Sequence, residues 1–161
     1  MDKNEVLAFL RQSNISYQIA EHPAAKTIEE IDSFHLPNSE YIVKNLFLRD
    51  DKKRNYYLLV LHKDKTADLK GLRTKLRTRP LSFASEADLS RLLSLPKGSV
   101  TPLGILNDES RSVQVFVDSE VLLFPLVGIH PNDNTATVWL SPKDLWTIIE
   151  AHGNPFLPVN L

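Results

Sequence analysis

Two apolar segments joined by a charged turn constrain the fold most strongly. Tyr41–Leu48 reads as a strand, and the turn RDDKKRN separates it from a second apolar run, Tyr56–His62. Strand-like runs that flank a short polar turn pair as an antiparallel hairpin. Segments with helical patterns lie on both sides of this hairpin along the chain. We therefore expect a mixed α/β fold, with a mostly antiparallel curved sheet and helices packed around it, instead of a doubly wound parallel sheet.

Capping signals mark the starts of four predicted helices. In each, a Ser, Thr or Asp is followed three residues later by Glu or Asp, and the capping residues are Asp2, Thr27, Ser85 and Ser141. The helix that starts at Thr27 is expected to reach about Phe34. The segment ADLKGLRTKL, residues 67–76, is a further expected helix.

The remaining strands are predicted from alternating apolar residues. This alternation is present at residues 15–19 and again at residues 113–117. The segment TATVWL, residues 135–140, is expected to be the final strand. Between residues 94 and 110, two prolines, two glycines and an Asn-Asp turn predict a packed loop and no helix.

Length and composition describe one ordinary globular domain over residues 1–161, with 42% hydrophobic and 24% charged residues. The formal net charge of −1 provides no general basic field, so contact with RNA requires a local patch, and DNA is not an expected partner. Lys70–Arg79 is the richest basic segment. The absence of cysteine excludes disulfides and thiolate chemistry. No leader pattern or long apolar span is visible, which predicts a cytoplasmic protein without a membrane partner.

The histidines give no metal-binding pattern. They are scattered along the chain without HExxH or His-x-His spacing, at His22, His35, His62, His130 and His152. With thiolates also absent, we expect neither a metal site nor a cofactor.

Lys44 and Asn45 interrupt both faces of the first hairpin strand. Alternation puts Lys44 with Ile42 and Leu46 on one face, and Asn45 with Val43 on the other. In a structural interpretation, the Lys44 stem covers apolar surface while the ammonium reaches water. In a functional interpretation, the charge meets the phosphate or carboxylate of a ligand, because a buried charge requires a partner.

Two loops have a similar ambiguity. The segment GSVTP, Gly98–Pro102, is either an ordinary turn or a backbone shaped to approach a ligand, using the freedom of glycine and the rigidity of proline. In VGIHPND, residues 127–133, His130 is either a capping side chain or a group that projects into a pocket.

Taken together, these segments resemble the superfamily of YbaK-like proteins and the editing insertion domain of bacterial prolyl-tRNA synthetases. Within it, the chain is most similar to the free-standing alanyl-tRNA(Pro) deacylases called ProXp-ala, or PrdX. The resemblance covers nearly the whole chain, in the family's order, and its segments are EHPAAKTIEE, YIVKNLFLRDDKKRNYYLLVLH, DLKGLRTKL, LSFASEADLSRLLSLPKGSVTPLGILND and FPLVGIHPNDNTATVWLSPKDL. The lysine of the second segment, the Gly-x-x-x-Pro loop and the Gly-x-His-Pro segment are the most specific.

The resemblance implies a single editing domain that hydrolyses the ester between a wrong amino acid and the terminal ribose of a tRNA, without a metal ion. It implies that Lys44 presents its charge to the acceptor-end phosphate or the ester, and that His130 holds the substrate amine or the 2′-hydroxyl. Both are the expected catalytic residues. The expected substrate-binding residues are Asn45, Gly98, Ser99, Val100, Thr101, Pro102 and Gly128. Four apolar residues either set the pocket size or simply belong to the core: Ile42, Leu46, Val100 and Leu126.

The expected substrate is mischarged Ala-tRNA(Pro), with prolyl-tRNA synthetase as a transient partner. Two alternatives stay open: another mischarged amino acid, cysteine or serine, or a binding module for aminoacyl-tRNA or a proline-related ligand that performs no turnover. The basic segment 70–79 either contacts the acceptor stem or is a solvated helix face.

Overall fold

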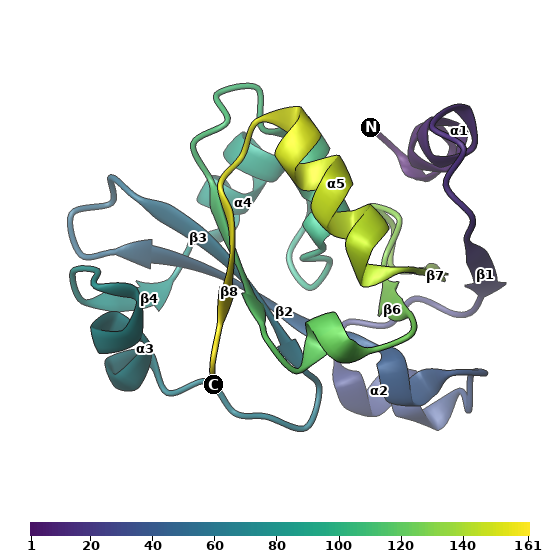
Figure 1. Cartoon of the computed structure of the whole chain (residues 1–161), viewed down its shortest axis with the longest axis horizontal. Coiled ribbons are helices and arrows are strands. Elements are labelled where there is room, and N and C mark those ends of the chain that lie inside the picture. Colours follow the sequence, from purple (N-terminus) through teal and green to yellow (C-terminus); the bar gives the residue numbers. More distant parts are fainter.

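The strands form two sheets that meet at one side of the molecule (Figure 1). The computed structural model describes residues 1–161. The large sheet has the order β4-β2-β3-β5-β8, with β2 at Val43–Asp50, β3 at Tyr56–His62, β4 at Leu81–Phe83, β5 at Gln114–Asp118 and β8 at Phe156–Val159. The small sheet has the order β1-β7-β6, with β1 at Gln18–Glu21, β6 at Val127–Ile129 and β7 at Ala136–Leu140.

The expected hairpin is the centre of the large sheet. β2 pairs antiparallel with β3, with Val43 opposite His62 and Arg49 opposite Tyr56. β5 then pairs in parallel with β3, and β8 in parallel with β5. Four of the six strand pairings are antiparallel, so the predicted mixed α/β class with mostly antiparallel strands is confirmed.

All five expected α-helices are present, at Lys3–Gln12 (α1), Ile28–Ser33 (α2), Leu69–Leu76 (α3), Glu86–Leu93 (α4) and Pro142–His152 (α5). The predicted capping side chains accept hydrogen bonds from the backbone N–H three residues on, at 2.8 Å for Asp2, 3.2 Å for Thr27, and 3.0 Å for both Ser85 and Ser141. These bonds satisfy N–H groups that the first helical turn leaves unpaired. No helix combines the length and the apolar character that crossing a membrane requires.

The helices cover opposite faces of the large sheet. The alternation expected for β2 is confirmed, because Val43 and Phe47 belong to the largest apolar cluster whereas Leu48 belongs to another. The largest cluster is completed by α1, α4 and α5. On the other face, α3 packs Leu72 against Leu48 and its neighbours. In Figure 1, α4 and α5 lie above the hairpin, and α2 and α3 lie below it.

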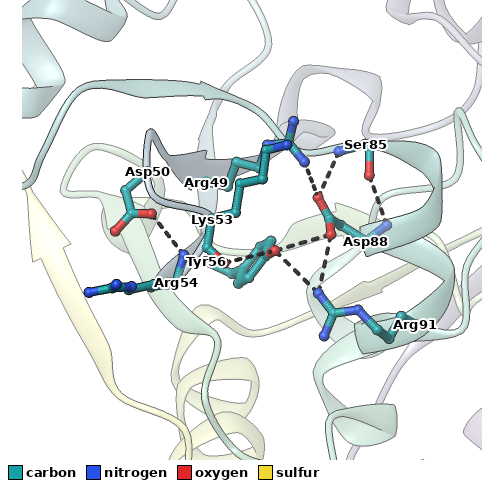
Figure 2. Close-up of polar contacts among 8 residues, drawn as sticks. All are labelled: Arg49, Asp50, Lys53, Arg54, Tyr56, Ser85, Asp88 and Arg91. Atoms are coloured by element: carbon teal, nitrogen blue, oxygen red, sulfur yellow. Dashed lines mark hydrogen bonds and ion pairs between the residues drawn. The ribbon is translucent and has the colours of Figure 1, made fainter.

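Asp88 anchors α4 to the hairpin (Figure 2). Its carboxylate accepts hydrogen bonds from Arg49 at 2.6 Å, from the Tyr56 hydroxyl at 3.1 Å and from Arg91 at 3.2 Å. Burial by itself raises the pKa of this carboxyl, but the N–H of Ser85 and the arginines outweigh it, so the pKa of Asp88 lies well below its usual value. The ionised carboxylate therefore stabilises the fold at neutral pH.

The helix after Thr27 ends at Ser33 with Phe34 as its C-cap, as expected. Two other local expectations were wrong. The segment 94–110 is not wholly a loop, because Pro102–Asn107 forms a 3-10 helix with Thr101 at its N-cap and Pro102 in its first turn. The strand at Ala136–Leu140 is not the last, since β8 follows α5.

Candidate active site

One parallel bridge joins the two sheets and brings the two expected catalytic residues together. Ile42, just before β2, pairs with Gly128 of β6. Two residues further along each segment come Lys44 and His130. In parallel pairing, positions two residues beyond a pair keep the same register and the same face. Lys44 and His130 accordingly line one cleft, whose volume is about 480 Å³, within the usual range for small-molecule sites.

The cleft follows a free edge of β2. β4 pairs only with residues 48–50 of β2, so residues 43–46 have no strand partner on that side. The carbonyl of Phe47 accepts from Ala84 N at 2.9 Å, which shows that its backbone groups point to this edge. Backbone groups alternate in direction along a strand, so those of Asn45, two residues before Phe47, point to the same edge. Lys44 and Asn45 therefore both line the cleft although they belong to opposite faces of the strand.

Asn45 contributes an unsatisfied polar atom. Its side-chain Oδ1 is buried and accepts no hydrogen bond from the protein. Buried polar atoms without a partner are rare in folded proteins, which sets Asn45 apart from the other residues of the strand.

The Lys44 ammonium has no anionic partner. Lys63, also in the cleft, forms an ion pair with Asp32 at 2.8 Å, whereas no carboxylate lies within ion-pair distance of Lys44. Lys44 is half-buried, and it makes no side-chain hydrogen bond. Its charge is therefore available to a phosphate or to negative charge that develops in a reaction.

His130 has a defined tautomer. Its Nδ1 lies 3.0 Å from the carbonyl oxygen of Ala136, so Nδ1 carries the proton and Nε2 is an acceptor. Burial lowers the pKa of His130, and the nearby ring of His22, at 6.2 Å between centroids, acts in the same direction. The imidazole is neutral at neutral pH, and it can accept a proton or a hydrogen bond.

His22 and Thr137 extend this arrangement, and neither was predicted as a site residue. Nδ1 of His22 donates to the carbonyl of Pro23 at 2.8 Å, which leaves Nε2 to accept the Thr137 hydroxyl proton at 2.9 Å. The ring also stacks on Phe34 at 5.3 Å. Because its proton is directed to His22, the hydroxyl of Thr137, which lines the cleft, offers only acceptor lone pairs to a ligand.

The Gly-Pro loop divides into lining and supporting residues. Gly98 and Val100 line the cleft, and their N–H groups donate to no acceptor in the protein. Gly98 has φ +81°, a conformation that favours glycine. Thr101 does not line the cleft: its buried hydroxyl donates to the carbonyl oxygen of His130 at 2.6 Å. Ser99 and Pro102 are also buried away from the cleft.

Gly128 lines the cleft, but packing against protein explains the glycine. A Cβ at this position would lie 2.7 Å from Nε1 of Trp139 and 2.9 Å from Cγ1 of Ile42. Both neighbours are buried, and Trp139 donates its N–H to the carbonyl of Asn38 at 3.1 Å. Glycine thus permits the close approach of β6 to Ile42 and Trp139 that forms the bridge.

The opposite wall of the cleft comes from α2 and the residues before it. Sequence reasoning missed this wall, which comprises Lys26, Thr27, Ile28, Glu29, Ile31 and Asp32. Of the expected size-setting residues, Ile42, Leu46 and Val100 line the cleft, whereas Leu126 packs against the apolar cluster that contains Trp139 and Ile31. No three His, Asp or Glu side chains gather in a group that would hold a metal ion.

The fold and the cleft define a class of protein. It is an α/β domain with a polar site where the two sheets meet, and this site contains a cation without a partner, a neutral imidazole and unpaired backbone N–H groups. Comparison with known proteins identifies the family. The aminoacyl-tRNA editing domain family matches residues 22–148. The chain belongs to this family, and the resemblance expected from the sequence is confirmed.

Individual relatives cover almost the whole chain. The prolyl-tRNA editing protein ProX of Acetoanaerobium sticklandii is 47% identical, over 99% of this chain and 97% of its own length. Prolyl-tRNA synthetase associated domain-containing protein 1 of Xenopus laevis is 32% identical, over 94% of this chain and 92% of its own. The solved structure of hypothetical protein APE2540 has the same fold, with a TM-score of 0.74 at 20% identity, over 98% of this chain and 99% of that one.

Proposed function

We propose that this protein is a trans-editing deacylase that hydrolyses the ester of mischarged Ala-tRNA(Pro). Membership of the editing-domain family supports the reaction class, and the names of the two relatives support prolyl-tRNA as the context. The observation that carries the proposal is the pairing, across one cleft, of an ammonium without a partner and an imidazole whose Nε2 is free to accept.

Editing of this kind compensates for the limited selectivity of a synthetase pocket. A synthetase pocket made for proline cannot strongly exclude the smaller alanine, because each missing methylene changes binding by only about 1–3 kcal/mol. A second site too small for proline can remove what the first site admits. An aminoacyl ester is already activated, so a site that positions water and stabilises the oxyanion is sufficient, and no nucleophilic side chain is needed.

In the proposed reaction, the oxygen of a water molecule attacks the ester carbonyl carbon. The bond from that carbon to the ribose oxygen breaks, the ribose oxygen receives a proton, and the products are alanine and free tRNA. Lys44 binds the terminal phosphate or the developing negative charge. His130 accepts a hydrogen bond from the 2′-hydroxyl or the substrate amine through Nε2.

Other cleft groups have supporting roles in this proposal. The free N–H groups of Gly98 and Val100 donate to the oxyanion. The Thr137 hydroxyl is an acceptor suited to the substrate ammonium, and Asn45 lines the cleft through its backbone groups at the free edge of β2. All these groups belong to the protein, so treatment with a chelator is expected to leave the rate unchanged.

The test is binding and deacylation of alanyl-, cysteinyl-, seryl- and prolyl-tRNA(Pro), with Lys44→Ala measured alongside. We expect selective hydrolysis of the alanyl ester, and loss of that activity in Lys44→Ala with an unchanged melting temperature. Full activity in Lys44→Ala refutes the role of the lysine. Hydrolysis of cysteinyl- or seryl-tRNA in place of alanyl-tRNA retains the reaction class and changes the substrate. Tight binding of aminoacyl-tRNA without hydrolysis of any ester identifies a binding module.

A further inference from the structure

The basic helix α3 lies on the same face of the large sheet as Lys44. Lys44 and Leu48 share a face of β2, and Leu72 of α3 packs in the cluster that contains Leu48. Four residues of strand separate Lys44 from Leu48, or about 13 Å along β2. Figure 1 shows α3 below the hairpin, on the same side as α2, which forms the far wall of the cleft. A ligand that leaves the cleft along this face would pass α3.

Three cations form a row on the outward side of α3. Lys70, Arg73 and the C-cap Arg77 are spaced three and four residues apart, which brings residues to one side of a helix. All three are exposed, and none makes a side-chain hydrogen bond or an ion pair. The inward side of the same helix is apolar, with Leu72 buried and Leu69 and Leu76 partly buried.

Neighbouring basic residues do have structural partners. Lys75 donates to the carbonyl of Asn160 at 2.7 Å, and Arg79 forms an ion pair with Asp51 at 2.6 Å. The latter contact ties the segment after α3 to the β2–β3 turn. That turn presents three more exposed basic residues whose side chains have no partner, Lys52, Lys53 and Arg54.

Helix electrostatics alone do not account for the row. Cations near a helix C-terminus are favourable, which would explain Arg73 and Arg77. Lys70 lies in the first turn, where a positive charge opposes the helix dipole, and that turn contains no acidic residue. The only carboxylate at this end of α3 belongs to Asp68, which caps the helix by accepting from Lys70 N at 3.2 Å.

We propose that the row Lys70, Arg73 and Arg77 binds the phosphate backbone of the tRNA acceptor arm whose 3′ end enters the cleft. This inference rests on the proposed function, because it names how the same substrate is held. A stacked nucleic-acid strand carries one phosphate per about 3.4 Å, so it offers several anionic groups to the successive cations of a row. The row thus adds unpaired positive charge on the sheet face to which Lys44 belongs.

RNA fits this surface better than a protein partner does. The cations form an extended track with no apolar residue exposed on α3, whereas the core of a protein interface is enriched in aromatic and apolar side chains. The overall net charge is −1, so this track is a local feature and not part of a general basic surface.

The experiment measures binding of uncharged tRNA(Pro) at several salt concentrations, and hydrolysis of Ala-tRNA(Pro), for the full chain. The test variant combines Lys70→Gln, Arg73→Gln and Arg77→Gln, since glutamine removes the charge but keeps a polar side chain of similar helix propensity. The control variant combines Lys3→Gln, Arg11→Gln and Lys143→Gln. It removes the same charge from α1 and α5, the helices that complete the apolar cluster on the opposite face of the sheet.

If the proposal is right, the slope of log K against log salt becomes shallower by about 2–3 in the test variant, one phosphate contact being lost per cation. KM for Ala-tRNA(Pro) rises while kcat is retained, and the control variant keeps the wild-type slope and KM. Equal slopes and KM values in wild type and test variant overturn the proposal. Equal weakening of binding in both triple variants also overturns the proposal, because the effect would then come from net charge.

The two proposals fail separately. Binding to uncharged tRNA requires no ester, so a protein that binds through α3 and hydrolyses nothing contradicts the proposed function and leaves this inference standing. A protein that hydrolyses Ala-tRNA(Pro) with unchanged KM after the three substitutions contradicts only the inference. Thermal melting of each variant checks that the fold is intact, which matters most for the control, because Lys3 pairs with Glu21 at 3.6 Å and Arg11 donates to the Tyr17 hydroxyl at 3.0 Å.

Discussion

Replacement of Gly128 by alanine tests whether the bridge between the sheets sets the geometry of the cleft. The new methyl carbon would lie 2.7 Å from Nε1 of Trp139 and 2.9 Å from Cγ1 of Ile42, both too close. Neither side chain can move aside easily, because Trp139 is 1% exposed and Ile42 is 5% exposed. Overpacking of this kind costs about 1–3 kcal/mol of unfolding free energy. For a chain of this length, that lowers the melting temperature by about 2–12 °C.

The larger effect is expected on turnover. Relief of the contact moves β6 away from Ile42 and carries His130 away from Lys44. A displacement of about 1 Å in an active site can reduce turnover by about 100-fold. The assay is deacylation of Ala-tRNA(Pro) at a temperature well below the melting transition of the variant, so that the folded fraction is the same as in wild type.

Gly153→Ala is the matched control. Gly153 has φ +105° at the end of α5, and a Cβ there would lie 2.8 Å from Cδ of Arg111. The substitution introduces strain of about 1–3 kcal/mol outside the cleft. We expect a similar fall in melting temperature with turnover retained. Full turnover in Gly128→Ala, or equal losses of turnover in both variants, would refute the reasoning about the bridge.

Three further outcomes are expected. Asp88→Asn should lower the unfolding free energy by about 2–3 kcal/mol at pH 7, as measured by denaturant titration. The pKa of Asp88 is depressed in the folded state, so the contribution of its carboxylate to stability is present above the unfolded value of 3.8 and is lost as pH falls toward the folded value. A difference in unfolding free energy between wild type and Asp88→Asn that persists undiminished in acid contradicts this. For His130, whose pKa is lowered from 6.5, turnover should be flat through neutral pH and decline only below 6.5, and a decline that begins above 7 contradicts a neutral imidazole. Thr137→Val should reduce kcat/KM for Ala-tRNA(Pro) with a stability loss of about 1 kcal/mol, and the idea fails if the steady-state kinetics are unchanged.

Local signals predicted the fold where one short segment determines its own structure. The capping residues located the helix starts, and the charged turn located the hairpin, because these contacts form within a few residues of chain. β8 was not predicted from the sequence because it is short, contains Pro158 and pairs only with β5. The division of the strands into two sheets depends on which distant segments pair, so no local pattern indicates it.

The site was likewise predicted only in part. Lys44, Asn45 and His130 stood out because each breaks an apolar pattern or lies in a specific motif. His22 lies in a segment that supported the resemblance, but its link to Thr137 depends on packing between segments more than one hundred residues apart. The α2 wall carries ordinary charged and apolar residues, and only the tertiary fold makes it part of a cleft.

The bridge between Ile42 and Gly128 also determines where the chain tolerates changes in length. Exactly one residue, Val43 or Ile129, separates each bridge partner from its cleft side chain. An insertion or deletion at either spacer would rotate Lys44 or His130 to the other face of its strand, out of the cleft. The turn at residues 51–55 lies at the far end of the hairpin and has no such restriction. We therefore expect this chain to tolerate an insertion at that turn better than an insertion at either spacer beside the bridge.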